Sequence, residues 1–104
     1  MEALILFSTC PTDVATEIGR KLVQAKLAAC VNIIPAIQSI YRWQDAVEEA
    51  KESLLMIKTS QACYPALEAE IQNLHPYETP EIIVLPIAEG SKAYMQWLLS
   101  SCIA

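Results

Sequence analysis

The stretch that decides how the second half of the chain folds is Leu74-His75-Pro76-Tyr77-Glu78-Thr79-Pro80-Glu81. It contains the only histidine and two of the six prolines, and it leads directly into the apolar segment Ile82–Ile87. Each proline fixes its own φ and biases the residue before it toward extended backbone. The stretch is therefore either a rigid connector from a helix to a strand, or a small polar site that displays an imidazole, a phenol and two carboxylates.

Two elements are predicted at the N-terminal end of the chain. The short apolar run Ala3–Thr9 is typical of a buried strand. Thr12 then indicates the start of a helix as its N-cap, with Asp13 favourable in the first turn. The residues that form the apolar stripe of this helix, at spacings of three and four, are Ala15, Ile18, Leu22, Ala25 and Ala29.

The middle of the chain predicts a hairpin. Cys30–Trp43 has the β-branched and aromatic residues of a strand, and Pro35 within it predicts a bend or bulge and a position at a sheet edge. The polar and acidic segment Gln44–Glu52 is the predicted connection, and Ser53–Thr59 is the predicted partner strand.

The rest of the chain completes one domain. A second helix is predicted from an apolar stripe at spacings of three, four and three, with Pro65 in its first turn; the stripe consists of Tyr64, Leu67, Ile71 and Leu74. A fourth strand spans Glu81–Ile87. Gly90 and Ser91 open a short C-terminal helix. The order β-α-β-β-α-β plus one helix predicts a single α+β domain over residues 1–104, of the ferredoxin-like split βαβ type.

Composition bounds the class of partner. The chain is 54% hydrophobic and only 18% charged, against about 25% charged residues in an ordinary globular protein. A domain of 104 residues should need more polar surface, so we expect part of the apolar excess to be buried between copies of the chain. The net charge is −5 and the basic residues are scattered, which excludes a typical nucleic-acid-binding surface.

The cysteines and the hydropathy predict a cytoplasmic protein. The four cysteines form no Cys-x-x-Cys pair, which argues against a zinc ribbon or a thioredoxin-type site. The first apolar run is too short and wrongly charged for a secretory signal, and no stretch approaches the length of a membrane span. We therefore expect reduced thiols and no membrane partner.

Taken together, these elements resemble the CutA divalent-cation-tolerance family. The segments that carry the resemblance are Lys26–Pro35, Ser39–Trp43, Glu52, Leu54–Thr59, His75–Ile83, Leu85–Ile87, Gly90, Tyr94 and Trp97. The resemblance implies a ferredoxin-like subunit in a stable homotrimer whose long hairpins cross between subunits. It also implies a role in tolerance of divalent metals, copper being the metal most often proposed, and an architecture similar to PII-type signalling trimers.

The chain departs from the family pattern at three positions. Asp45 stands where a turn glycine is usual, and aspartate tolerates that geometry. Ser8 stands where some members carry a cysteine, for which Cys10 is a substitute two residues later, and Leu74 stands where some carry a second histidine.

A soft-metal site requires imidazole or thiolate ligands. His75 and Cys10 are the predicted metal ligands, with copper or another divalent cation as the candidate ion and a neighbouring subunit completing the shell. The alternative is structural: a histidine before a proline also suits the C-terminus of a helix, where a partial positive charge is favoured.

A second group of residues is predicted to gather at one end of the sheet, and it consists of Tyr41, Trp43, Lys58, Tyr77, Glu78 and Glu81. It is either a pocket for a small ligand or a cluster that holds subunits together. No nucleophile beside a base and no glycine-rich phosphate loop is encoded, so an enzyme is not expected. The sequence thus predicts a trimeric metal-binding protein or a PII-like sensor of a small ligand.

Overall fold

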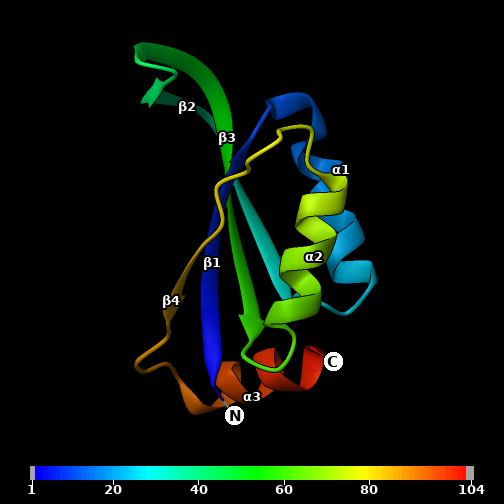
Figure 1. The fold of residues 1–104 in the computed structure, drawn as a ribbon. Coiled ribbons are helices and arrows are strands. Elements are labelled where there is room, and N and C mark those ends of the chain that lie inside the picture. The colour runs from blue at the N-terminus through cyan, green and yellow to red at the C-terminus, as the bar shows by residue number, and fades with distance from the viewer. Residues whose placement is uncertain (1, 103–104) are drawn as a thin grey trace.

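The computed structural model describes residues 2–102. Its elements, in chain order, are β1 (Ala3–Cys10), α1 (Thr12–Gln24), β2 (Cys30–Trp43), β3 (Ala46–Ser60), α2 (Tyr64–Leu74), β4 (Ile83–Pro86) and α3 (Lys92–Ser101). The strands form one sheet in the order β2-β3-β1-β4, with every neighbouring pair antiparallel. Helices α1 and α2 lie side by side against one face of the sheet, and α3 lies across the end where β1 begins (Figure 1). The predicted ferredoxin-like α+β fold with an additional C-terminal helix is confirmed.

The core lies between the sheet and the two long helices. Alternate residues of β1 and β3 face inward, among them Leu6, Leu55 and Ile57, and meet the apolar stripes of α1 and α2. Burying a leucine or isoleucine side chain stabilises the fold by roughly 1.5–3 kcal/mol. This packing fixes the sheet register, because a slip of one residue would turn every inward side chain toward solvent.

The hairpin of β2 and β3 extends well beyond the rest of the sheet (Figure 1). β2 is an edge strand, as predicted, and its register shifts between Ile34 and Ile37, next to Pro35. The prediction that residues 44–52 form the connection of the hairpin is wrong. The turn consists of Gln44 and Asp45, both at positive φ (50° and 65°), and β3 starts directly after it.

The reason is that polar residues on an exposed hairpin do not break it. The segment after the turn pairs along β2, and the Gln38 amide donates a hydrogen bond to Glu49 Oε1 at 2.8 Å. Its acidic side chains lie on a strand that projects into solvent. In the sequence alone, a run of acidic residues is typical of a loop.

Three further boundaries differ from the prediction. The N-cap of α1 is Pro11, and Thr12 is already helical, its Oγ1 accepting a hydrogen bond from Ser53 Oγ at 3.0 Å. The helix ends at Gln24, so Ala25 and Ala29 of the predicted stripe lie beyond it. Strand β4 is shorter than predicted. The predicted start of α2, with a proline in its first turn, is confirmed, and so is the predicted start of α3.

No helix between residues 2 and 102 is long and apolar enough to cross a membrane.

Candidate functional site

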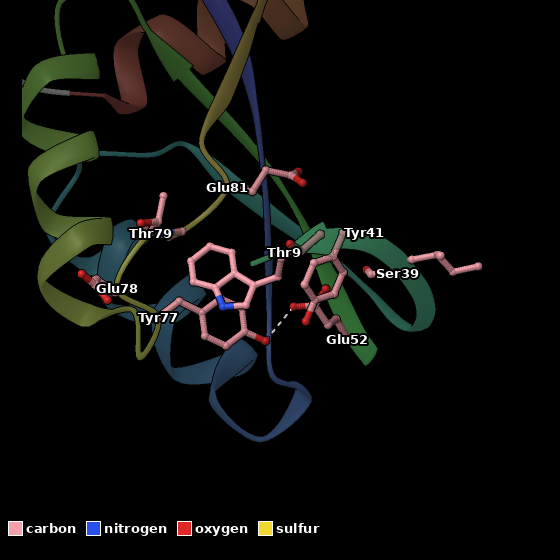
Figure 2. A pocket seen from close by; sticks show the side chains of 11 residues that line it. Thr9, Ser39, Tyr41, Glu52, Tyr77, Glu78, Thr79 and Glu81 are labelled. Atoms are coloured by element: carbon pink, nitrogen blue, oxygen red, sulfur yellow. Dashed lines mark hydrogen bonds between the residues drawn. The ribbon is translucent and has the colours of Figure 1, made fainter. Parts of the chain in front are cut away.

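A cavity of about 660 Å³ opens between the projecting part of the long hairpin and the connector from α2 to β4, residues 75–82 (Figure 2). Its lining residues are Thr9, Ser39, Ile40, Tyr41, Trp43, Glu52, Tyr77, Glu78, Thr79, Pro80 and Glu81. Three segments that are distant in the sequence therefore meet here: the end of β1, the hairpin and the connector.

His75 positions the connector against β1. It is the C-cap of α2, and its backbone N–H donates to the Ile71 carbonyl at 2.8 Å. Its Nδ1 accepts a hydrogen bond from the Tyr77 backbone N–H at 3.1 Å, so the proton of the neutral ring is on Nε2, which donates to the Thr9 carbonyl at 2.8 Å. With 7% of its surface exposed, the imidazole joins the connector to the end of β1.

Tyr77 reaches from the connector to β3. Its hydroxyl donates a hydrogen bond to Glu52 Oε2 at 2.8 Å. The centre of its ring lies 4.7 Å from the centre of the His75 ring. Burial, followed by the hydrogen bond and charge of Glu52, raises the pKa of Tyr77 to about 12. The phenol is therefore protonated at neutral pH and remains a donor to the carboxylate.

Glu52 is the most buried acidic group of the cavity, with 4% of its surface exposed. Glu81 lies at the rim, where partial burial, followed by the charge of Glu52, raises the pKa of its carboxyl. Glu78 lines the cavity too, but its carboxylate points away from Glu52 (Figure 2). Of the residues that the structure describes, no lysine, arginine or histidine lines the cavity, so the site is negative and aromatic.

The structure brings together five of the six residues predicted as a ligand or inter-subunit pocket: Tyr41, Trp43, Tyr77, Glu78 and Glu81. Lys58 is not among the residues that line the cavity. Lys58 lies six residues beyond Glu52 on β3, about 20 Å along the strand, and its Nζ sits 5.6 Å from the centre of the Tyr94 ring on α3.

The two predicted metal ligands are poorly placed to bind an ion, although His75 contacts Thr9, the residue before Cys10. Both ring nitrogens of His75 are engaged in hydrogen bonds. Cys10 is fully buried, and burial, followed by the charges of Glu52 and Asp13, raises the pKa of its thiol to about 11, so it is not a thiolate at neutral pH. Residues 2–102 contain no group of three or more His, Cys, Asp or Glu side chains placed to hold a metal. Metal binding by His75 and Cys10 stays a prediction that would require local opening.

Sequence reasoning missed Glu52 as a site residue. The sequence pattern predicts Glu52 at the end of a loop, whereas it lies inside β3, opposite Ile37 at the irregular part of the β2 pairing. Glu52 and Ser53 are both buried, which breaks the simple alternation of a strand. The signal that could have identified it was an acidic residue immediately before the apolar run of β3.

Comparison with known proteins places the chain among close relatives. Residues 4–101 match the family described as "CutA1 divalent ion tolerance protein". The chain is 48% identical over 98 residues to the divalent-cation tolerance protein CutA of Thermus thermophilus, covering 94% of this chain and 95% of the relative. It is 50% identical to human protein CutA, covering 88% of this chain but only 52% of that longer protein.

Solved structures agree with the fold. The structure described as CutA1 from Oryza sativa superposes with a TM-score of 0.96 at 36% identity, covering 99% of this chain and 95% of that one. The Thermus thermophilus Cut A1 structure has a TM-score of 0.93 at 48% identity, covering 98% and 99% of the two chains.

Proposed function

This chain belongs to the CutA1 divalent ion tolerance family, and from that premise we propose that it is a homotrimeric binding protein that takes a cation into the acidic cavity and catalyses no reaction. The family description names tolerance of an ion and no reaction. The imidazole of His75 is held by Thr9 and Tyr77, so it is not available as a general base.

One observation carries the cation proposal: Glu52 is a buried carboxylate without a positive partner among residues 2–102. Its hydrogen-bonding partner, the Tyr77 hydroxyl, is neutral. Removing a carboxylate from water is costly unless an opposite charge compensates for it. A cation entering the cavity supplies that charge, and it also relieves the repulsion between Glu52 and Glu81.

Exposed apolar surface supports the trimer. Ile40 and Val47 on the hairpin are each 64% exposed, and Ile83 and Leu85 on the edge strand β4 are 56% and 54% exposed. Single exposed apolar side chains are ordinary, but here they follow a projecting hairpin and an open sheet edge. Contact with other copies would cover both, and the number of three comes from the family resemblance.

A divalent metal ion is the cation to which the family description points. Carboxylate oxygens of Glu52 and Glu81 would bind it, with the remaining ligands supplied by water or a neighbouring subunit. Copper prefers imidazole and thiolate ligands, and His75 and Cys10 are both sequestered. Cu(II) nevertheless belongs in the test because it is the metal that the resemblance implies.

A second candidate is a PII-like sensor of a small molecule. It is favoured by the volume of the cavity and by its aromatic walls, Tyr41, Trp43 and Tyr77. Cavities of about 300–1,000 Å³ are typical of small-ligand sites.

We also propose a cytoplasmic location. The four cysteines, all of which lie in the described part of the chain, are free. Free thiols are typical of a reducing compartment.

Calorimetric titration of the purified protein with Cu(II), Zn(II) and Mn(II) tests the proposal. Glu52→Gln removes the buried charge but keeps an acceptor for Tyr77, and Glu89→Gln removes an exposed charge outside the cavity. We expect at least one metal to bind about tenfold or more weakly to the Glu52 variant, equivalent to about 1.4 kcal/mol, and normally to the Glu89 variant. Equal binding by both variants would exclude the cavity as the cation site.

A further inference from the structure

The size of the cavity bears on what occupies it. Its volume of about 660 Å³ is that of a site for a small organic molecule and far exceeds the space of a single metal ion. A metal ion would use only the part of the cavity next to the carboxylates. The rest of the lining would then have no ligand to contact.

That remaining lining is aromatic. Tyr41 and Trp43 lie on β2, and Tyr77 lies on the connector. The exposed fractions of their surfaces are 44%, 49% and 40%, respectively. The face of an aromatic ring attracts a cation, tryptophan most strongly, and it also covers the carbon substituents that a bare metal ion lacks. Aromatic walls are therefore suited to a cation that carries apolar groups.

The charges of the cavity select the same class of molecule. Glu52 is buried and lacks a positive partner among residues 2–102, and Glu81 adds a second carboxylate at the rim. A ligand with phosphate or carboxylate groups would meet these charges without a lysine or arginine to offset them, since none lines the described cavity. Nucleotides and organic anions are therefore poor ligands.

We infer that the cavity binds a substituted organic ammonium ion, with its charge against Glu52 and its carbon substituents against Trp43, Tyr41 and Tyr77. The inference deepens the proposed function and rests on it, because both require a cation in this cavity. It differs in requiring the aromatic walls, which coordination of a metal by carboxylates does not use.

The test compares a cation with its neutral isostere. The probe is (2-hydroxyethyl)trimethylammonium chloride, and 3,3-dimethylbutan-1-ol has the same shape without the charge. Binding of each to the whole protein is measured by calorimetry in EDTA at constant ionic strength. We expect the ammonium ion to bind at micromolar to millimolar concentration and its isostere at least about tenfold more weakly.

Two substitutions locate the site. Trp43→Leu should weaken binding of the ammonium probe about tenfold, whereas Trp97→Leu should leave it unchanged, because Trp97 lies on α3 beside Tyr94 and outside the cavity. If Trp43→Leu fails to assemble, Tyr41→Leu serves in its place. Glu52→Gln should abolish the preference for the charged probe.

The outcomes separate the two proposals. Equal affinity for the charged and neutral probes, or loss of affinity in Trp97→Leu but not in Trp43→Leu, would overturn this inference. If the ammonium probe fails to bind while a metal binds in a Glu52-dependent way, the inference fails and the proposed function stands. If neither binds in the cavity, both fail.

Discussion

At the scale of single residues, the cavity depends on three hydrogen bonds. His75 Nε2 donates to the Thr9 carbonyl, the Tyr77 backbone N–H donates to His75 Nδ1, and the Tyr77 hydroxyl donates to Glu52. The sequence pointed to the connector that contains two of these residues, but it left open whether His75 binds a metal or caps a helix. The structure shows the cap and adds a side-chain role, which depends on Thr9, 66 residues away in sequence. No local pattern predicts such a contact.

His75→Ala should destabilise the fold. The substitution leaves the Thr9 carbonyl and the Tyr77 N–H without their partner in a mostly buried place, at a cost of roughly 1–3 kcal/mol. The midpoint of urea unfolding measures the change, with Asn73→Ala at the exposed end of α2 as the control. An unchanged midpoint would mean that water replaces both bonds.

Acid should weaken binding of a cation. The pKa of the Glu81 carboxyl is raised from its ordinary value of 4.5. As the pH is lowered, Glu81 therefore takes up a proton and loses its negative charge while the pH is still above 4.5. Affinity should therefore be greatest near neutral pH and fall as the pH is lowered from about 7 toward 4.5. Glu81→Gln should lower the affinity at neutral pH and flatten the profile. An identical pH profile in this variant would remove Glu81 from the site.

Cys10 should be inert toward thiol reagents in the folded protein. It is fully buried and the pKa of its thiol is raised to about 11, so almost no thiolate exists at pH 8. Cys30, which is partly exposed, should be modified first. Mass spectrometry after brief alkylation identifies the modified residue, and unfolded protein is the control. Rapid labelling of Cys10 would show that the end of β1 opens and would revive the metal prediction.

At the scale of elements, the sequence predicted every helix and strand in the right order, because hydrophobic periodicity reports which face of each element is buried. It failed at the hairpin. The acidic segment after the turn has the composition of a loop, yet it pairs with β2 along its length. The same error concealed Glu52, whose inward direction depends on pairing across an irregular register.

The hairpin tip should tolerate glycine better than the native residue. Asp45 has a φ of 65° and follows Gln44 at 50°, the left-handed pair of a tight two-residue turn. Asp45→Gly should stabilise the protein by about 0.5–1 kcal/mol, since glycine adopts this geometry without steric cost. Thermal unfolding measures the gain. Ala50→Gly, in the middle of β3, is the control and should destabilise, and a loss of stability in both variants would contradict the turn assignment.

At the scale of the whole molecule, the composition predicted assembly and the structure shows where apolar surface is available: on the projecting hairpin and on β4. Light scattering over about a hundredfold dilution should give three times the chain mass of 11.5 kDa, because the apolar surface exposed in one subunit favours a stable complex. Ile40→Lys should shift the mass toward one chain, while Glu2→Lys, a charge change away from the hairpin, should not. A stable folded monomer of wild-type protein would contradict the trimer.

Crystals soaked with Mn(II) show whether the acidic cavity takes a cation. Anomalous scattering distinguishes manganese from water and from lighter ions. We predict a peak at coordination distance, about 2.0–2.6 Å, from a carboxylate oxygen of Glu52, and no such peak in crystals of Glu52→Gln. A peak beside His75 and Cys10 with none at Glu52, or the same peak in both crystals, would contradict it.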